Sequence, residues 1–272
     1  MGAIKLFGYA RVFGSVVRDV LRSKPNSGSR PFRPVSKFSV IIPTFNESKR
    51  IYDAIQTVKR ERHILDIIVS DGGSSDDTRA VAGRLGALVI QEKKGRGCQI
   101  HSGIQHCRGD IILILHGDCR LRYGILNHIL ARLNQDRKLI GGALGMRFDP
   151  EDIKSRLLAR LNNGRARYLG IAFGDQSQFF RSEALPLIGG FPNQMLMEDV
   201  ELSLRLKHQG CLCFIPRGVV VSKRRWERRG FFKNCRIVLS LLTQYLFERH
   251  LGPGDDKRKS YYQRYYDRTL KE

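Results

Sequence analysis

The run Ile111-Ile112-Leu113-Ile114-Leu115-His116-Gly117-Asp118 decides the fold of this chain. Its unbroken apolar residues predict a strand that is buried on both faces, and the strand leads directly to the carboxylate of Asp118. In sheets of parallel strands, ligands bind beyond the carboxyl ends of the strands. Asp118 is therefore the first candidate for a functional residue.

Segments on either side of this run alternate between strand and helix patterns. Before it, the patterns predict strands at 38–43, 65–69 and 87–90 and helices at 51–58, 76–85 and 97–107. After it, they predict strands at 142–148 and 178–180, short strands up to residue 221, and helices at 153–168, 199–208 and 231–250. Repeated strand–helix units predict an α/β fold with a mostly parallel sheet that is flanked by helices.

The length and the composition favour one catalytic domain with appendages. With 272 residues, 42% of them hydrophobic, the chain can bury one large core. We expect the domain at 38–252, a basic extension at 1–37 and a polar tail at 253–272. Apolar residues at helical spacing in the extension predict a basic amphipathic helix, and a Pro/Ser/Gly linker follows it at 23–36. The helix suits an organelle transit peptide, a membrane-surface anchor or a helix packed on the domain.

The charge and the cysteines narrow the class of protein. A formal net charge of +22 predicts a polyanionic partner, which is a nucleic acid, an anionic membrane surface or a phosphate-bearing substrate. The basic residues lack the interleaved aromatic residues of a single-strand-binding protein, which argues against nucleic acid. None of the six cysteines has the paired spacing of a structural zinc site, so we expect reduced thiols and an intracellular, reducing compartment. No apolar stretch reaches the roughly twenty residues that a membrane span needs, although 237–247 is compatible with peripheral membrane contact.

Three loops that follow predicted strands carry residue types that suit nucleotide binding. The first loop consists of Pro43, Thr44, Phe45, Asn46 and Glu47. In the second, glycines and small hydroxyl side chains follow Asp71, and they let a ligand approach the backbone closely. The third contains Gly95 and Arg96 and leads into a helix, whose free N–H groups suit a phosphate.

Taken in order, these loops and His116-Gly117-Asp118 resemble the nucleotide-sugar half of an inverting glycosyltransferase of family two with the GT-A fold. Further segments resemble the acceptor side and the basic-Trp element of that family: 174–181, 189–192, 197–202 and 224–228. The resemblance covers roughly 38–252. It is closest to a small bacterial-type subgroup whose metal motif reads His-Ala-Asp, and here His116 stands where a first Asp often does.

The resemblance implies a Rossmann-like nucleotide-binding half, an acceptor half and a role for each matching residue. Asp71 would bind the nucleotide base, and Asp118 would bind manganese or magnesium together with diphosphate oxygens and water. Asp199, beside Glu198, would be the catalytic base, although acids here also suit the start of a helix. His116 would be a contact near the sugar or a packed core histidine. The remaining residues implied in donor binding are Pro43, Thr44, Phe45, Asn46, Glu47, Gly95, Arg96, Gln176, Arg224, Arg225 and Trp226.

The hypothesis is a metal-assisted transferase that moves a sugar, with inversion, from a nucleoside diphosphate sugar to an acceptor hydroxyl. A UDP-hexose is the expected donor, a GDP-sugar also fits, and the acceptor is open, with a lipid at a membrane surface as one candidate. We expect Asp71, Asp118 and Asp199 to converge on one cavity. Two alternatives remain at this point: a nucleotidyltransferase on a related α/β fold, and a noncatalytic basic protein that binds membranes or nucleic acid.

Overall fold

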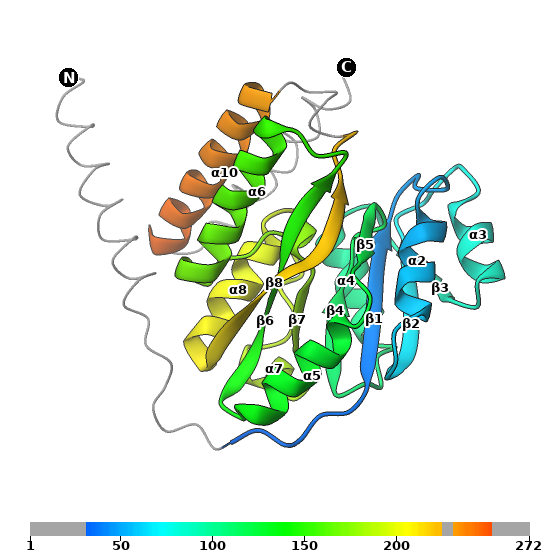
Figure 1. The fold of residues 1–272 in the computed structure, drawn as a ribbon, viewed down its shortest axis with the longest axis horizontal. Coiled ribbons are helices and arrows are strands. Elements are labelled where there is room, and N and C mark those ends of the chain that lie inside the picture. Colours follow the sequence, from blue (N-terminus) through cyan, green and yellow to red (C-terminus); the bar gives the residue numbers. More distant parts are fainter. Residues whose placement is uncertain (1–30, 225–230, 252–272) are drawn as a thin grey trace.

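A single eight-stranded sheet with helices on both faces is the framework of the molecule (Figure 1). The computed structural model describes residues 31–224 and 231–251 of the chain. The strands are arranged in the order β3-β2-β1-β4-β7-β6-β8-β5. The predicted α/β class is confirmed. The expected basic extension at 1–37 lies largely outside the described residues, and the expected tail at 253–272 lies wholly outside them.

The first half of the chain builds a parallel sheet around a fully buried strand. Strands β1 (Phe38–Thr44), β2 (Ile64–Asp71), β3 (Leu88–Gln91) and β4 (Ile111–Ile114) run in the same direction. Thr44 pairs with Asp71 in the register of β1 and β2, so the polar residues after these strands meet at one edge. This edge is where the sequence predicted ligand binding.

The second half of the chain extends the sheet with mixed directions. Strand β7 (Gln178–Arg181) is antiparallel to both β4 and β6 (Leu139–Asp149). Strand β8 (Cys211–Ser222) runs parallel to β6, and β5 (Cys119–Leu121) pairs antiparallel with β8. The chain therefore leaves β4 through His116-Gly117-Asp118 and enters β5 at the far end of the sheet order.

Alternation of side chains along β1 divides the core between the two faces of the sheet. Val40 and Ile42 pack in one apolar cluster, while Ile41 packs in the other. Helices α2 (Ile51–Lys59), α3 (Thr78–Arg84) and α5 (Ile125–Gln135) contribute to the first cluster. Helices α4 (Arg96–Ile104), α7 (Ala184–Leu187) and α8 (Glu198–Gln209) contribute to the second.

Helices α6 (Ile153–Gly164) and α10 (Phe231–Leu251) lie side by side at one end of the molecule (Figure 1). Leu241 and Tyr245 of α10 pack against Val200 and Leu204 of α8. Helix α10 is thus attached to α8 rather than to the sheet. Within 31–224 and 231–251, no helix combines the length and the apolar character needed to cross a bilayer.

Several boundaries differ from those expected. The predicted helix at 153–168 ends as an α-helix at Gly164, and a π-helical turn, Arg165–Leu169, continues it. The short strands expected before residue 221 are one strand, β8. Strand β5 was not predicted, because three residues carry too little periodicity to reveal it. Helix α5 was missed although its buried residues recur at helical spacing, at Ile125, Leu126, Ile129, Leu130 and Leu133.

The described part of the predicted linker, residues 31–36, is packed against the domain. Phe32 and Val35 are buried, and the side chain of Arg181 reaches this segment from β7. The guanidinium of Arg181 donates to the carbonyl oxygens of Arg33 at 2.6 Å, Leu133 at 2.6 Å and Leu139 at 2.8 Å. Residues 31–36 of the expected linker thus lie against the domain, since the buried Arg181 needs acceptors and the Arg33 carbonyl group is one of them.

Replacing Arg181 with Met should destabilise the fold, because the carbonyl groups of Leu133 and Leu139 would lose the guanidinium that donates to them and the segment at 31–36 would lose its anchor. We expect a loss of about 3 kcal/mol in the free energy of unfolding, measured by denaturant titration. Arg84→Met at an exposed position of α3 is the matched control and should change stability by less than about 0.5 kcal/mol. Equal unfolding curves for the two variants would contradict the anchoring role.

Candidate active site

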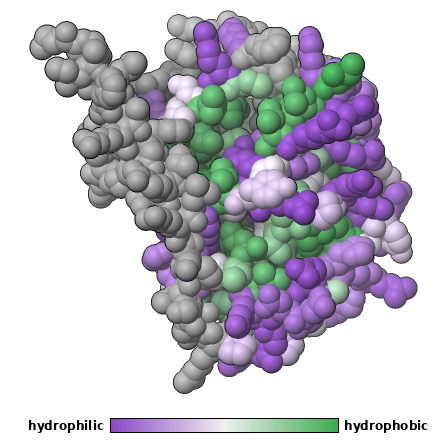
Figure 2. All heavy atoms as spheres, turned by 60° about the vertical axis from the view of Figure 1, so that its left-hand side comes forward, coloured by the Kyte–Doolittle hydropathy of each residue, from purple (hydrophilic) through white to green (hydrophobic). Residues whose placement is uncertain are grey.

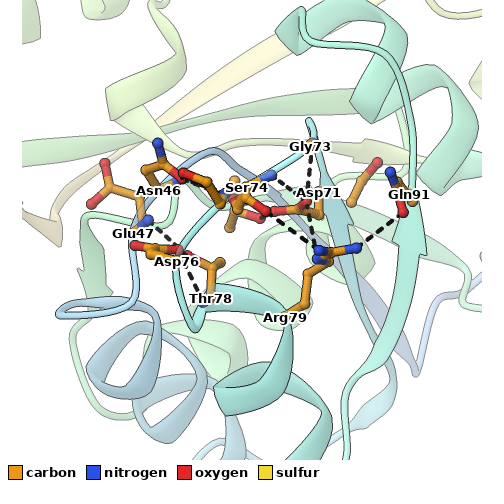
Figure 3. A network of polar contacts seen from close by, with 12 residues as sticks. Asn46, Glu47, Asp71, Gly73, Ser74, Asp76, Thr78, Arg79 and Gln91 are labelled. Atoms are coloured by element: carbon orange, nitrogen blue, oxygen red, sulfur yellow. Dashed lines mark hydrogen bonds and ion pairs between the residues drawn. The ribbon is translucent and has the colours of Figure 1, made fainter.

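Two loops at the carboxyl edge of the sheet are joined by hydrogen bonds between their backbones and side chains (Figure 3). The N–H of Asn46 donates to Ser74 Oγ at 2.8 Å, and the N–H of Ser75 donates to Asn46 Oδ1 at 2.9 Å. The N–H of Glu47 donates to Thr78 Oγ1 at 2.9 Å. Asn46 has a φ of 53°, a left-handed conformation that asparagine tolerates. The loops after β1 and β2 therefore form one preorganised unit.

Asp71 shapes this unit from inside. Its side chain is fully buried, and Oδ2 accepts hydrogen bonds from the N–H groups of Gly73 at 3.0 Å and Ser74 at 2.8 Å. Its Oδ1 accepts from Ser74 Oγ at 2.5 Å. In Figure 3 the Arg79 guanidinium lies beside the same carboxylate, at 3.8 Å. The carboxylate thus folds the loop into its shape, and the role predicted for Asp71 in binding the base stays a prediction.

The other residues of the first loop present a mixed surface at the same edge. Pro43 and Thr44 are buried, whereas Phe45 and Asn46 are exposed. The ammonium of Lys94 lies 3.9 Å from the centre of the Phe45 ring. Glu47 forms an ion pair with Arg224 at 3.1 Å, which connects the first loop to the segment that follows β8.

A glycine brings the third loop against the segment that precedes α8. A Cβ atom on Gly97 would lie 1.9 Å from the carbonyl oxygen of Gln194, so only glycine allows the first turn of α4 to approach this backbone. Gly95 precedes the helix with a φ of 145°. As a result, Arg96 Nε lies 2.8 Å from Glu198, and its Nη2 lies 3.8 Å from Asp199. The sequence predicted a phosphate contact for Arg96 and missed this pairing.

The two acids at the start of α8 occupy different environments. Asp199 Oδ2 accepts the N–H of Gly174 at 2.8 Å, and Oδ1 accepts the N–H of Val200 at 2.7 Å. The side chain of Glu198 is 1% exposed, and burial raises its pKa above the ordinary value of 4.5 to about 7, against the attraction of Arg96. The charge of Asp199 also raises this pKa. Asp199, unlike Glu198, lines a cavity.

The segment between β4 and β5 connects this cavity to the loop after β1. His116 lines the same cavity as Asp199, and a Cβ on Gly174 would lie 2.4 Å from its Nε2. The Cα of Gly117 faces Thr44, because a Cβ there would lie 3.0 Å from the Thr44 methyl group. His116 is therefore a buried residue that shares a cavity with the predicted base, and its role as a contact near the sugar stays a prediction.

Asp118 lies on a second, polar cavity of about 290 Å³, lined also by Lys49, Arg50, Asp53, Arg120, Asp149 and Ser222. The cavity of Asp199 measures about 350 Å³ and does not include Asp118. The expectation that Asp71, Asp118 and Asp199 converge on one cavity is thus not met in the described cavities. Asp71 is turned into its own loop. Only Gly117 lies between His116 and Asp118 in the sequence, yet the two side chains line different cavities.

Gln176 serves a role that the sequence did not indicate. It is fully buried, and its Oε1 accepts hydrogen bonds from Arg165 Nη2 at 2.9 Å and from the N–H of Phe173 at 3.2 Å. Arg165 stacks 3.4 Å from the centre of the Phe173 ring and lines the cavity of Asp199. Burial lowers the pKa of Arg165 to about 10, so the group stays cationic at neutral pH. Gln176 therefore holds Arg165, which sequence reasoning missed, and does not line a described cavity; Arg225 and Trp226 lie outside the described residues.

Glu198 should make the folded protein less stable as the pH rises. Glu198 binds its proton more tightly in the folded protein than in the unfolded chain. This proton therefore stabilises the fold below about pH 4.5, and the stabilisation is lost as the pH rises to about 7. Glu198→Gln removes the titrating group. The difference in melting temperature, wild type minus Glu198→Gln, should therefore fall between pH 4.5 and 7, whereas the difference for the exposed control Glu151→Gln should stay constant. A constant difference for Glu198→Gln would refute the raised pKa.

Comparison with known proteins identifies the family of the chain. The model of glycosyl transferase family 2 matches residues 39–187, more than half of the 272 residues. The chain is 29% identical over 136 residues to glycosyltransferase AglJ of Haloferax volcanii, covering 49% of this chain and 43% of that protein. It is 32% identical over 108 residues to the GalNAc(5)-diNAcBac-PP-undecaprenol beta-1,3-glucosyltransferase of Campylobacter jejuni, covering 36% of this chain and 35% of that protein. The chain thus spans less than half the length of both relatives.

A solved structure supports the same conclusion at the level of the fold. The mannosyltransferase PcManGT from Pyrobaculum calidifontis, in complex with GDP-Man and Mn²⁺, superposes with a TM-score of 0.59 at 18% identity. The match covers 92% of this chain and 73% of that chain. The mixed sheet with helices on both faces is therefore the GT-A fold that the sequence resemblance implied. The chain belongs to glycosyl transferase family 2.

Proposed function

We propose that this protein transfers a sugar from a nucleoside diphosphate sugar, a UDP-hexose, to an acceptor hydroxyl by single displacement with inversion. One observation carries the proposal: Asp199 is fixed by two backbone N–H groups and Arg96 at the wall of a cavity that is large enough for an acceptor. Family membership favours this reaction over nucleotidyl transfer and over binding without catalysis. The catalytic domain would comprise residues 38–252.

Asp199 would take the proton of the acceptor hydroxyl as its oxygen attacks the anomeric carbon. A base needs a fixed lone pair near the reacting group, and the bonds to Gly174 and Val200 hold the carboxylate in one orientation. Because the base and the attacking hydroxyl lie on the side of the sugar opposite the leaving diphosphate, a single displacement inverts the anomeric carbon. Arg96 and the buried Glu198 would keep Asp199 in place.

The joined loops after β1 and β2 would bind the nucleoside, and basic residues at the same edge would bind the diphosphate. Phe45 offers an exposed aromatic ring and Asp71 fixes the loop beneath it. Lys94 lies just before α4 and Arg96 is the first residue of this helix, whose first N–H groups suit a phosphate. Arg225 and Trp226 would complete the diphosphate contacts by the resemblance alone.

Asp118 would hold Mn²⁺ or Mg²⁺. Within the described ranges, no group of three or more His, Cys, Asp or Glu side chains is arranged to hold a metal. The cavity of Asp118 also contains Asp53, Asp149 and three basic side chains, and Asp149 pairs with Arg120. The Asp118 carboxylate suits a hard cation that takes its other oxygen ligands from the diphosphate and water. When bound, the ion would neutralise charge on the leaving diphosphate. PcManGT, solved with GDP-Man and Mn²⁺, supports this assignment.

Asp199→Asn should abolish transfer and spare donor binding, because the amide keeps the shape of the side chain but is not a base. We expect a loss of about a hundred- to ten-thousand-fold in the rate of sugar transfer. The thermal shift caused by the donor should stay within error of the wild type. Asp136→Asn, at an exposed acid beyond α5, is the control and should keep full activity. Wild-type turnover in Asp199→Asn would remove this residue from the mechanism.

Asp118→Ala should abolish the effect of the metal on donor binding. In the wild type, manganese should increase the thermal stabilisation caused by the donor, since the ion and the diphosphate bind together. The variant should show the same shift with manganese as with a chelator. A screen of UDP- and GDP-sugars with both proteins identifies the donor in the same experiment. If manganese stimulates Asp118→Ala as strongly as the wild type, Asp118 is not the ligand.

A further inference from the structure

We propose that the acceptor is a membrane lipid, or a lipid-linked group, whose hydrocarbon chain lies between α6 and α10. This inference rests on the proposed function, because it assigns the acceptor to the cavity of Asp199. It goes beyond that function because it names the class of acceptor and the face of the molecule that meets the membrane.

The cavity of Asp199 is lined by polar residues and by apolar side chains of two helices. Its polar lining residues are Arg96, His116, Asn162, Arg165, Asp175, Asp199 and Asn234. Leu158 and Leu161 of α6 form one wall. The opposite wall is formed by residues of α10: Val238, Leu239, Leu241 and Leu242. A free sugar acceptor would need hydrogen-bond partners along its length, whereas these walls suit a hydrocarbon chain attached to one polar headgroup.

The apolar surface continues from the cavity to the outside of the molecule. Ile153, Leu157 and Leu161 recur every fourth residue on α6 and are 83%, 53% and 63% exposed. Leu239 of α10 is 62% exposed. Figure 2 brings this side forward and shows exposed apolar residues on both sides of a hollow. Contiguous exposed apolar surface of this kind marks an interaction site.

Charge on the same face points to an anionic membrane. On α6 and the turn that follows, Lys154, Arg156, Arg160 and Arg167 are exposed, and the sequence 153–164 contains no acidic residue. Lys233 and Arg236 are exposed on α10, and the first acid in that helix is Glu248. An apolar stripe bordered by basic residues is the pattern of helices that lie in the interface of a membrane with anionic lipids. A lipid is therefore the ligand that suits both the apolar stripe on α6 and the cavity of Asp199.

The lipid would be held with its polar group at the catalytic carboxylate. The cavity connects the exposed leucines to Asp199, so a chain that enters between α6 and α10 places its headgroup hydroxyl at the base. Arg165, which stays cationic at neutral pH, lines the same cavity and suits a headgroup phosphate. The proton of the hydroxyl passes to Asp199, its oxygen bonds to the sugar, and the nucleoside diphosphate leaves.

Binding to vesicles tests the membrane-facing surface without a donor sugar. The full chain should sediment with vesicles of phosphatidylcholine containing phosphatidylserine, and less with phosphatidylcholine alone. Leu157→Ser/Leu161→Ser, on the exposed stripe, should weaken binding about tenfold or more. Leu88→Ser, at an exposed leucine of the opposite edge strand β3, is the matched control and should bind like the wild type. Equal binding by the stripe variant and the control would overturn the proposal.

A second measurement addresses the cavity itself. Octyl glucoside below its micellar concentration should raise the melting temperature of the wild type more than methyl glucoside does, because only the octyl chain reaches the apolar walls. Leu161→Ser/Leu239→Ser should lose this difference while its thermal shift with the donor is retained. No dependence on chain length in the wild type would overturn the proposal, whereas failure of the donor shift alone would count against the proposed function.

The basic N-terminal segment supplies the competing explanation for membrane binding. Phe13→Ser/Val17→Ser in the full chain removes apolar residues from that segment. If this variant loses vesicle binding and the variants of α6 do not, the membrane contact belongs to the N-terminal segment and the proposal is overturned. Wild-type binding by this variant, together with weak binding by the α6 variant, would support membrane contact through the apolar stripe on α6.

Discussion

The contact of Arg96 with Glu198 and Asp199 is the interaction on which the candidate site depends. It joins the first turn of α4, in the nucleotide half, to the first turn of α8, in the acceptor half. The contact exists because Gly97 lets the helix approach the backbone of Gln194 more closely than any side chain would permit. The loop proposed to bind phosphate and the carboxylate proposed as the base are thereby held next to each other, as a reaction between two substrates would require.

The contact contains two acids, Glu198 and Asp199, but only one arginine, Arg96. Negative groups are therefore in excess. The structure resolves the excess by position, since Glu198 is withdrawn from solvent while Asp199 reaches the cavity. Burial favours the neutral form of Glu198 and raises its pKa to about 7. When Glu198 is neutral, only Asp199 in this contact offsets the positive charge of Arg96. The remaining positive charge would attract the diphosphate of the proposed donor.

The sequence predicted those features that depend on local patterns. Unbroken apolar runs gave β1 and β4, and helical spacing gave α2 and α8, because burial on one or both faces determines these patterns directly. The loops at the carboxyl edge followed from the parallel topology. Partners that meet only in the folded chain were not predictable: the guanidinium of Arg96 faces acids about a hundred residues away, and the amide of Gln176 is used by Arg165. The separation of Asp118 from Asp199 also arises from a local turn that leaves no pattern.

The apolar wall of the cavity is positioned by the same helix that carries the base. Glu201 of α8 accepts hydrogen bonds from the Tyr245 hydroxyl at 2.5 Å and from Arg249 at 2.8 Å, both on α10. Asp199 lies two residues earlier on α8, so the position of α10 is set relative to the base by one rigid element. Low polarity around a carboxylate strengthens its interactions, and a hydrocarbon chain in the cavity would exclude water from it. The wall that would bind the acceptor would in this way also raise the effectiveness of the base.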